Sequence, residues 1–286
     1  MLEDDTLTDA ATVRVRQRTL IEMYGYCYRK AEEVNGRVGV ARLTYQGEDE
    51  SSFSSFSEDV ANYLAPPERW WPTDVMACEQ AIGRVLSIGC GAGRHALALA
   101  HAGHEVVGLD PSLDAVAVAR RRGVDARVGG LGDLPEGLGT FDTFLLAGGG
   151  LHLLGVLDNV PAALAGLAEV ANRGAWLIGT STLADGADDS VAAPDAALDR
   201  VLYRLRVEHG AEVTEWSEWG YAAEVTPPQL DRLVAGTGWA IEEITQARSV
   251  TEGVYDLSAD ENDDTSAVDT LSYLARLRLA PRRPPA

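Results

Sequence analysis

From residue 84 onward, short apolar runs alternate with longer segments whose apolar positions recur at helical spacing. Short apolar runs bounded by glycine or polar residues predict strands, and the helical spacing predicts amphipathic helices. The predicted strands are 85–88, 105–109, 125–128, 141–147 and 175–180, and the predicted helices are 94–102, 112–122 and 160–171. Because such alternation is typical of a parallel sheet with helices on both faces, we expect an α/β fold.

The N-terminal segment, residues 1–80, has a different pattern. It contains a charged amphipathic stretch at 13–29, a polar stretch at 46–57, and apolar positions at helical spacing in 56–64 and 75–82. The spacing predicts helices joined by a loop. We therefore expect an N-terminal helical cap segment that packs on the sheet.

An insertion is predicted at about residues 183–226, after the fifth strand. Alternating positions at 201–207 and 211–221 indicate the two strands of a hairpin. A helix then opens at Pro227 and Pro228, and strands at 239–245 and 249–257 close the domain. The alternating region with its insertion therefore spans residues 81–258.

The C-terminal segment, residues 259–286, is predicted to be an acidic and proline-rich tail. Residues 259–265 are acidic and polar, and the chain ends in Pro281-Arg-Arg-Pro-Pro-Ala. Because such a composition buries little apolar surface, we expect the tail to be flexible, except for a short helix at 271–279.

Three alternate glycines, Gly89, Gly91 and Gly93, separate the first predicted strand from the first helix. Glycine permits a sharp turn and lets a ligand lie against bare backbone, and the following helix offers unpaired N–H groups. Asp110 ends the second predicted strand, where a carboxylate can accept both hydroxyls of a ribose. The pattern predicts a nucleotide-type cofactor site. Because Gly91 to Ala96 also fits the dinucleotide fingerprint, the glycines alone do not exclude NAD.

Composition narrows the classes of partner. The formal net charge of −20 repels a phosphate backbone, which argues against nucleic acid as a partner. The three cysteines are widely spaced, so neither a disulfide framework nor a thiolate metal site is predicted. No stretch has the composition of a signal peptide or a membrane span, so we expect a cytoplasmic protein without a membrane partner.

Four segments, in this order, resemble the motifs of class I S-adenosylmethionine-dependent methyltransferases. They are Leu86-Ser-Ile-Gly-Cys-Gly-Ala-Gly-Arg-His, Val107-Gly-Leu-Asp-Pro-Ser, Gly132-Asp-Leu-Pro and Phe141-Asp-Thr-Phe-Leu-Leu. The resemblance covers about residues 84–255. It implies a Rossmann-like sheet of order 3-2-1-4-5-7-6 with strand 7 antiparallel, S-adenosyl-L-methionine (SAM) as cofactor and S-adenosyl-L-homocysteine as product.

The resemblance also implies the residues of the cofactor site. The glycines would lie against the methionine part of SAM, Asp110 on the ribose, and Asp133 with Leu134 at the adenine edge. The residues that end strand four would line the floor near the sulfonium. The complete implied set is Ser87, Gly89, Cys90, Gly91, Gly93, His95, Asp110, Pro111, Asp133, Leu134, Ala147, Gly148 and Gly149.

Several features decide between cofactors and acceptors. Gly89, the Gly-Asp-Leu-Pro segment and a closing pair of strands, in place of a second mononucleotide half, favour SAM over NAD. Ser87 stands where an acidic residue is usual in the family, which removes one anchor for the methionine amino group. Ala147-Gly-Gly-Gly replaces the Asn/Asp-Pro-Pro-aromatic sequence of enzymes that methylate amide or base nitrogens. That replacement argues against amide and base nitrogens as acceptors.

We therefore expect methyl transfer to a small organic acceptor, at an oxygen atom, and by analogy a role in natural product biosynthesis. The alternative is a SAM-binding homologue that catalyses another reaction or has lost catalysis, and an NAD-type oxidoreductase is a further alternative. His152, which follows the glycines at the end of strand four, is the candidate general base. Its structural alternative is to cap or pack the next helix.

Aromatic residues outside the sheet are candidates for an acceptor pocket in a cap formed by the N-terminal segment and the insertion. The alternative is that these rings attach the additions to the core and that the arginine pairs with a neighbouring acid. The candidate set is Tyr24, Tyr28, Trp70, Trp71, Arg204, Trp216 and Trp219.

Overall fold

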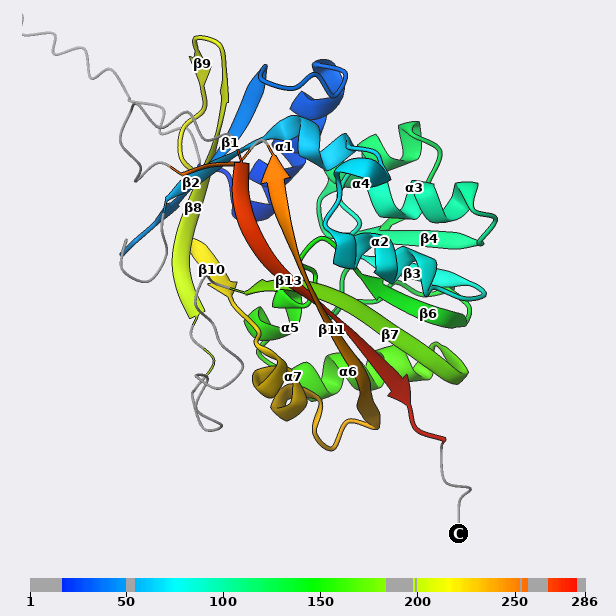
Figure 1. Ribbon diagram of the computed structural model, residues 1–286. Helices are drawn as coiled ribbons and strands as arrows, with labels where there is room; N and C mark the ends of the chain where they lie inside the picture. Colours follow the sequence, from blue (N-terminus) through cyan, green and yellow to red (C-terminus); the bar gives the residue numbers. More distant parts are fainter. Residues whose placement is uncertain are drawn as a thin grey trace, which may run out of the picture.

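The structure is a computed structural model that describes residues 17–49, 55–183, 198, 200–252, 254–256 and 267–281. Figure 1 shows a large mixed sheet flanked by helices, with a second sheet beside it. Among the described residues, no helix is long and apolar enough to cross a membrane.

The main sheet has seven strands in the order β11-β13-β7-β6-β3-β4-β5. Neighbouring strands from β5 to β7 are parallel, whereas β13 is antiparallel to both β7 and β11. In order of appearance along the chain this is 3-2-1-4-5-7-6 with the seventh strand antiparallel, so the predicted fold class and strand order are confirmed. The strands are β3 (Val85–Ile88), β4 (Val106–Asp110), β5 (Asp125–Val128), β6 (Phe141–Leu146), β7 (Ala171–Leu183), β11 (Trp239–Glu252) and β13 (Ala267–Leu279).

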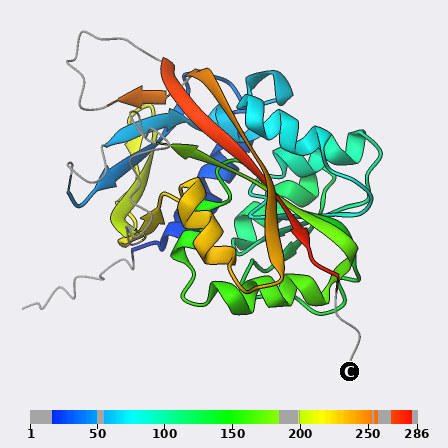
Figure 2. The ribbon, with the colours of Figure 1, turned by 60° about the horizontal axis from the view of Figure 1, so that its bottom comes forward.

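The seventh strand does not lie where the sequence pattern predicts it. The predicted closing strand at 249–257 begins as the end of the long β11, and β13 comes from the predicted flexible tail. The expectation of a tail with a short helix at 271–279 is therefore wrong for residues 267–279. Burial between two neighbouring strands stabilises β13, and Arg276 and Arg278 stack on Trp176 with guanidinium-to-ring distances of 4.2 and 4.9 Å. Figure 2 shows β11 and β13 side by side, in orange and red.

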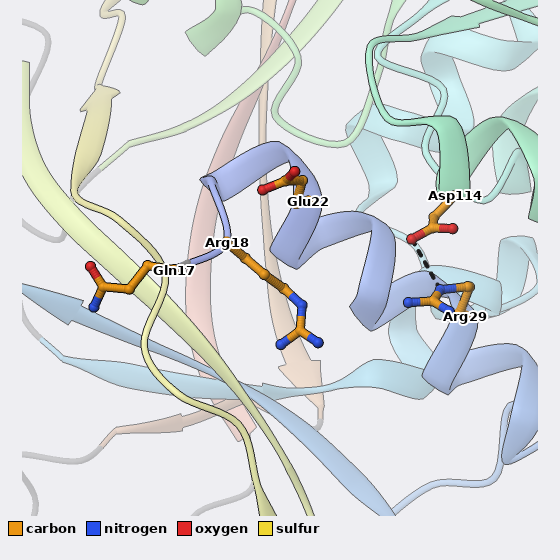
Figure 3. Close-up of a pocket in the computed structure, with 5 residues that line it drawn as sticks. All are labelled: Gln17, Arg18, Glu22, Arg29 and Asp114. Carbon is orange, nitrogen blue, oxygen red and sulfur yellow. Dashed lines mark ion pairs between the residues drawn. The ribbon is translucent and has the colours of Figure 1, made fainter. Parts of the chain in front are cut away.

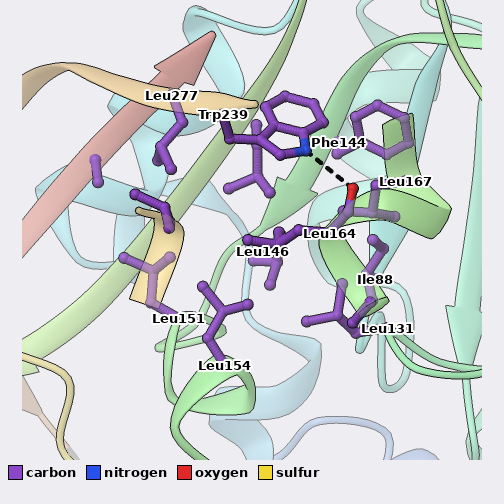
Figure 4. Close-up of a cluster of buried hydrophobic side chains, with 14 of the residues drawn as sticks. Ile88, Leu131, Phe144, Leu146, Leu151, Leu154, Leu164, Leu167, Trp239 and Leu277 are labelled. Carbon is purple, nitrogen blue, oxygen red and sulfur yellow. Dashed lines mark hydrogen bonds between the residues drawn. The ribbon is translucent and has the colours of Figure 1, made fainter. Parts of the chain in front are cut away.

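Helices cover both faces of the main sheet and form two apolar cores. One core packs α2 (Pro72–Glu79), α3 (Arg94–His101) and α4 (Leu113–Arg121) against residues such as Val85 and Leu145. The other packs α5 (His152–Val156), α6 (Val160–Glu169) and α7 (Pro227–Val234) against Leu86 and its neighbours. In this second core the Trp239 indole N–H donates to the Leu164 carbonyl at 3.0 Å (Figure 4). Between these two cores the parallel strands are aligned, so their carboxyl ends lie at the same edge of the main sheet.

The second sheet corrects the expectation of a purely helical cap over residues 1–80. Its order is β10-β8-β1-β2-β12, with β9 also paired to β8. The strands are β1 (Ala41–Gly47), β2 (Phe56–Asp59), β8 (Arg200–His209), β9 (Glu212–Val213), β10 (Gly220–Ala223) and β12 (Val254–Asp256). The predicted hairpin insertion is present, with its return strand divided into β9 and β10. Because β1 pairs with β8 across a long sequence separation, local periodicity could not reveal this sheet.

Helix α1 (Leu20–Glu33) joins the two sheets. A capping box begins it, in which the Thr19 hydroxyl accepts from the Glu22 N–H at 3.2 Å. The predicted start of this helix at residue 13 lies outside the described residues. Met23 and Cys27 on α1 are buried against Leu43 and Leu205 of the second sheet, while the short 3₁₀ helices η1 (Val60–Leu64) and η2 (Pro67–Arg69) complete the segment.

Candidate functional site

The glycine loop between β3 and α3 adopts a conformation that other residues rarely take. Gly89, Gly91 and Gly93 have φ values of 66°, 53° and 81°. A Cβ on Gly91 would lie 3.0 Å from the ring and hydroxyl of Tyr28, and one on Gly93 would lie 3.0 Å from Val124. Both backbone conformation and lack of space therefore require glycine, as the sequence pattern predicts.

Asp110, at the end of β4, ties the second strand to the glycine loop. Its Oδ2 accepts from the Gly91 N–H at 2.8 Å, and its Oδ1 accepts from the Ser112 N–H at 2.9 Å. The pKa of Asp110 is raised, because the effect of burial exceeds the opposing effect of these two hydrogen bonds. Each oxygen keeps a second lone pair for a ligand hydroxyl, so the carboxylate can orient the loop and still accept from a ribose.

Not every residue of the implied cofactor set directs its side chain to the loop. The Cys90 sulfur packs toward Gly108, 2.8 Å from the position that a Cβ would occupy there, and burial raises the pKa of the thiol. The His95 ring is buried against Trp70, with ring centroids 4.4 Å apart. Ser87 is buried within β3. Cys90 and Ser87 are thus expected to meet a ligand through their backbone.

The implied adenine edge lies beside Asp110. The Gly129 N–H donates to the Asp110 carbonyl at 3.2 Å, and a tight turn joins Gly130 to Asp133 through paired backbone hydrogen bonds of 3.0 Å. Asp133 is exposed, whereas Leu134 packs against the apolar core. Pro111 is exposed on the same edge, directly after Asp110.

Asp74, on α2, joins three parts of the site and was not singled out by the sequence. Its Oδ1 accepts from the Gly148 N–H at 2.8 Å and from the Thr180 hydroxyl at 2.7 Å. Its Oδ2 lies 3.7 Å from Arg94 Nη2 and 3.5 Å from His95 Nε2. The buried carboxylate therefore links the first turn of α3 to the glycines that follow β6.

These contacts shift the pKa values of both partners. Desolvation alone would raise the pKa of Asp74, but His95, Arg94 and Thr180 outweigh it and lower the pKa to about 2. Burial and the charge of Arg94 lower the pKa of His95. No signal in the sequence distinguishes Asp74 from other acids, because its partners come from distant segments.

His152 opens α5 directly beyond this turn. Its Nδ1 lies 2.7 Å from the Gly149 carbonyl, and since a carbonyl only accepts, Nδ1 carries the proton. The neutral ring therefore presents an unprotonated Nε2. The ring is solvent-exposed, yet the protein around it partly desolvates it and lowers its pKa. Beside it, a Cβ on Gly89 would lie 3.1 Å from Leu153, so α5 flanks the glycine loop.

The aromatic candidates divide into two groups. Tyr28 contacts Gly91, and the Tyr24 ring stacks on the Tyr28 ring at a centroid distance of 6.3 Å. The Trp71 ring lies 3.8 Å from the position of a Cβ on Gly149, at the turn after β6. Trp70 is buried, and its indole N–H donates to the Ala65 carbonyl at 2.7 Å. Tyr28 and Trp71 thus lie beside the glycine turns, and Tyr24 packs on Tyr28.

Arg204, Trp216 and Trp219 form a separate group. Arg204 stacks on Trp216 and Trp219 at 4.8 and 4.7 Å and donates to Gln46. On β8, side chains 203, 205 and 207 are buried toward α1, so Arg204 points to the opposite face of the sheet. The structure does not bring these three residues to the glycine loop.

A surface hollow lies along the junction of α1 and α4. Gln17, Arg18, Glu22, Arg29 and Asp114 line it, and Arg29 pairs with Asp114 at 3.0 Å (Figure 3). Because neither the glycine loop nor Asp110 lines this hollow, it is not the cofactor site that the sequence predicts. Within the described residues, no group of three or more His, Cys, Asp or Glu side chains could hold a metal ion.

Comparison with known families identifies the alternating region. Residues 85–174, which include the glycine loop and Asp110, match the family model described as a methyltransferase domain. The chain carries a methyltransferase domain with the class I fold. The resemblance seen in the sequence is thereby confirmed, and the chain is an enzyme of the methyltransferase class. No curated protein sequence matches this chain.

Solved structures share the fold of the methyltransferase domain. A SAM-dependent methyltransferase from Bacteroides fragilis, in complex with S-adenosyl-L-homocysteine, superposes with a TM-score of 0.61 at 21% identity, covering 91% of this chain and 95% of that one. The CcbJ methyltransferase from Streptomyces caelestis gives 0.52 at 17% identity, covering 76% and 92%. A protein described as converting a disulfide bond into a thioacetal group during echinomycin biosynthesis gives 0.50 at 25% identity, covering 76% and 84%.

Proposed function

We propose that this methyltransferase transfers the methyl group of SAM to an oxygen atom of a small organic acceptor. The observation that carries the proposal is the glycine loop clamped by Asp110, which offers bare backbone and a ribose acceptor at one edge of the sheet. The similar protein from Bacteroides fragilis was crystallised with S-adenosyl-L-homocysteine, the product that such a transfer leaves. The residues present fit SAM, with Asp110, Asp133 and the glycines as the groups that would hold it.

The topology favours SAM over a dinucleotide. After β7 the sheet closes with the antiparallel pair β13 and β11 rather than with a second set of parallel strands. A dinucleotide site of the Rossmann type uses two mononucleotide halves, so half of that site would be missing here. An NAD-type oxidoreductase is therefore disfavoured.

His152 is proposed to act as the general base. When bound, SAM supplies an electrophilic methyl carbon on a positively charged sulfur. His152 Nε2 would accept the proton of the acceptor hydroxyl during the transfer, and the resulting imidazolium ring would be held by the Gly149 carbonyl. Gly148 and Gly149, fixed by Asp74 and Thr180, position the turn that carries this histidine. Trp71 and Tyr28 supply apolar walls that exclude water from the reacting atoms.

We extend the proposal to natural product biosynthesis, because the description of one protein similar in fold names echinomycin biosynthesis. The test is incubation of the purified protein with SAM and a panel of hydroxylated small molecules, followed by mass spectrometry. We expect S-adenosylhomocysteine together with a singly methylated acceptor. Methylthioadenosine, or unchanged SAM with every acceptor, would instead support the homologue that binds SAM without methyl transfer.

A further inference from the structure

Five tyrosines line the inner face of the second sheet and the facing helices. This tyrosine cluster consists of Tyr24, Tyr28, Tyr45, Tyr63 and Tyr203, contributed by α1, β1, η1 and β8. The Tyr45 ring lies 6.5 Å from Tyr24 and 6.2 Å from Tyr203, and Tyr28 meets Tyr63 edge-on at 5.1 Å. The cluster is therefore one continuous aromatic wall assembled from four elements.

Two hydroxyls of this cluster share the carboxylate of Glu58, on β2. Its Oε1 accepts from Tyr45 and from Tyr63, whose hydroxyl oxygens are 2.8 Å apart. In β-sheet register Glu58 lies opposite Leu43, and Phe56 lies opposite Tyr45, so both face α1. Four residues of this region are only partly buried, so the aromatic wall is less enclosed than a hydrophobic core. They are Glu58, Tyr24, Tyr28 and Tyr63.

The carboxylate of Glu58 has no cation of its own within the described residues. Arg94, the cation that acts on it electrostatically, donates to the Asn62 carbonyl and lies beside Asp74 instead. The pKa of Glu58 is raised, because the effect of burial exceeds the opposing effect of the two tyrosine hydroxyls. A carboxylate withdrawn from water is stabilised by a cation, and tyrosine faces attract the same kind of group.

The cluster reaches the cofactor loop through Tyr28. The hydroxyl end of Tyr28 abuts Gly91, at 3.0 Å from the position of a Cβ, and its ring packs against Tyr63, which donates to Glu58. Burial raises the pKa of Tyr28, and the charges of Asp110, Cys27 and Glu58 raise it further. A small molecule seated on the cluster would thus adjoin the glycine loop.

We propose that Glu58 and the tyrosine cluster bind a protonated amino group of the acceptor, so that the substrate class is an organic amine that also carries a hydroxyl. The inference rests on the proposed function. An amine held as a cation has no lone pair for the methyl carbon, so it serves as a handle while the hydroxyl meets His152. Charge recognition by Glu58 and the aromatic faces then decides which alcohols enter.

The test compares two probes of equal shape, phenethylamine, which is protonated at neutral pH, and the neutral 2-phenylethanol. Each is titrated by saturation-transfer NMR into the wild-type protein loaded with S-adenosylhomocysteine, and into the protein without it. We expect the amine to bind at least about 10-fold more tightly than the alcohol, in keeping with a partly desolvated cation–π site and a charged partner. We expect Glu58→Gln to remove this preference and Glu48→Gln, at the exposed end of β1, to retain it.

Equal binding of amine and alcohol by the wild type would overturn the proposal, and so would a preference that survives in Glu58→Gln. The wild-type comparison decides alone if Glu58→Gln fails to fold, which its circular dichroism spectrum reveals. Failure of SAM to bind would refute the proposed function but leaves the amine preference measurable in the protein without cofactor. The two failures are therefore distinguishable.

Discussion

The two sides of the site are built by different means. On the main sheet, one continuous stretch from β3 to β4 supplies glycine backbone and the carboxylate of Asp110. On the second sheet, side chains from residues as far apart as Tyr24 and Tyr203 meet on one face. Under the two proposals, backbone holds a cofactor common to many enzymes, whereas side chains recognise an individual acceptor. The cofactor side can be predicted from a short sequence motif, whereas the tyrosine cluster can be recognised only in the three-dimensional structure.

Replacing Asp110 should affect the cofactor side most. Asp110→Ala removes two charge-assisted hydrogen bonds to the loop together with the ribose acceptor, so we expect SAM affinity to fall roughly 100-fold or more. Isothermal titration calorimetry measures it. Asp114→Ala is the matched control, because this acid pairs with the half-exposed Arg29 and such pairs contribute little. Wild-type affinity in Asp110→Ala would place the cofactor elsewhere.

Replacing His152 should act on the rate rather than on the cofactor. For an oxygen acceptor, His152→Ala is expected to lower kcat about 100-fold, the usual worth of a general base, with SAM affinity unchanged. Because desolvation lowers the pKa of His152, wild-type kcat/KM should fall only as pH drops below the usual histidine range, and the variant should lose this dependence.

Steady-state assays across pH measure both effects. His101→Ala, at the exposed end of α3, is the control variant. Unchanged turnover in His152→Ala at every pH would eliminate His152 as the base.

Replacing Asp74 should act on stability. Its pKa is lowered from 3.8 to about 2, which corresponds to about 2 kcal/mol of folding free energy. A lowered carboxyl pKa contributes stability at pH above the unfolded value, and the contribution is lost as pH falls toward 2. Asp74→Asn should therefore be about 2 kcal/mol less stable than the wild type at pH 7, with the difference narrowing between pH 4 and pH 2.

Urea unfolding at several pH values checks this difference. Glu79→Gln, which changes an exposed acid of the same helix α2, should leave stability nearly unchanged. A constant difference between wild type and Asp74→Asn over the whole pH range would show that the charge of Asp74 is not what stabilises the turn.

The smallest effects separate the two groups of aromatic candidates. Trp71→Ala removes a wall beside Gly149 and should raise the acceptor KM about 10-fold, whereas Arg204→Ala should leave KM within about twofold. Steady-state kinetics with the acceptor identified by the panel measures both. A larger effect in Arg204→Ala than in Trp71→Ala would mean that the acceptor binds on the opposite face of β8.

The contrast also explains how much the sequence could predict. Strands β3 to β7 and the helices between them follow local periodicity, and positive-φ glycines beside a strand-end acid form a motif that needs only neighbouring residues. β13 was missed because its Leu-Ala-Arg-Leu-Arg-Leu sequence suits a helix, and only burial between β7 and β11 makes it a strand. Asp74 was missed because Gly148 and Thr180, which bond to it, lie far away in the sequence. Glu58 was missed because local periodicity predicted neither β1, which carries its partner Tyr45, nor β2, on which it lies.

The central claim is that the glycine loop and Asp110 bind SAM and not a dinucleotide. Calorimetric titration of the wild-type protein with SAM and, separately, with NAD tests it most directly. The account predicts one SAM bound per chain and no measurable heat of binding with NAD. Saturable binding of NAD, or no binding of SAM, would contradict it.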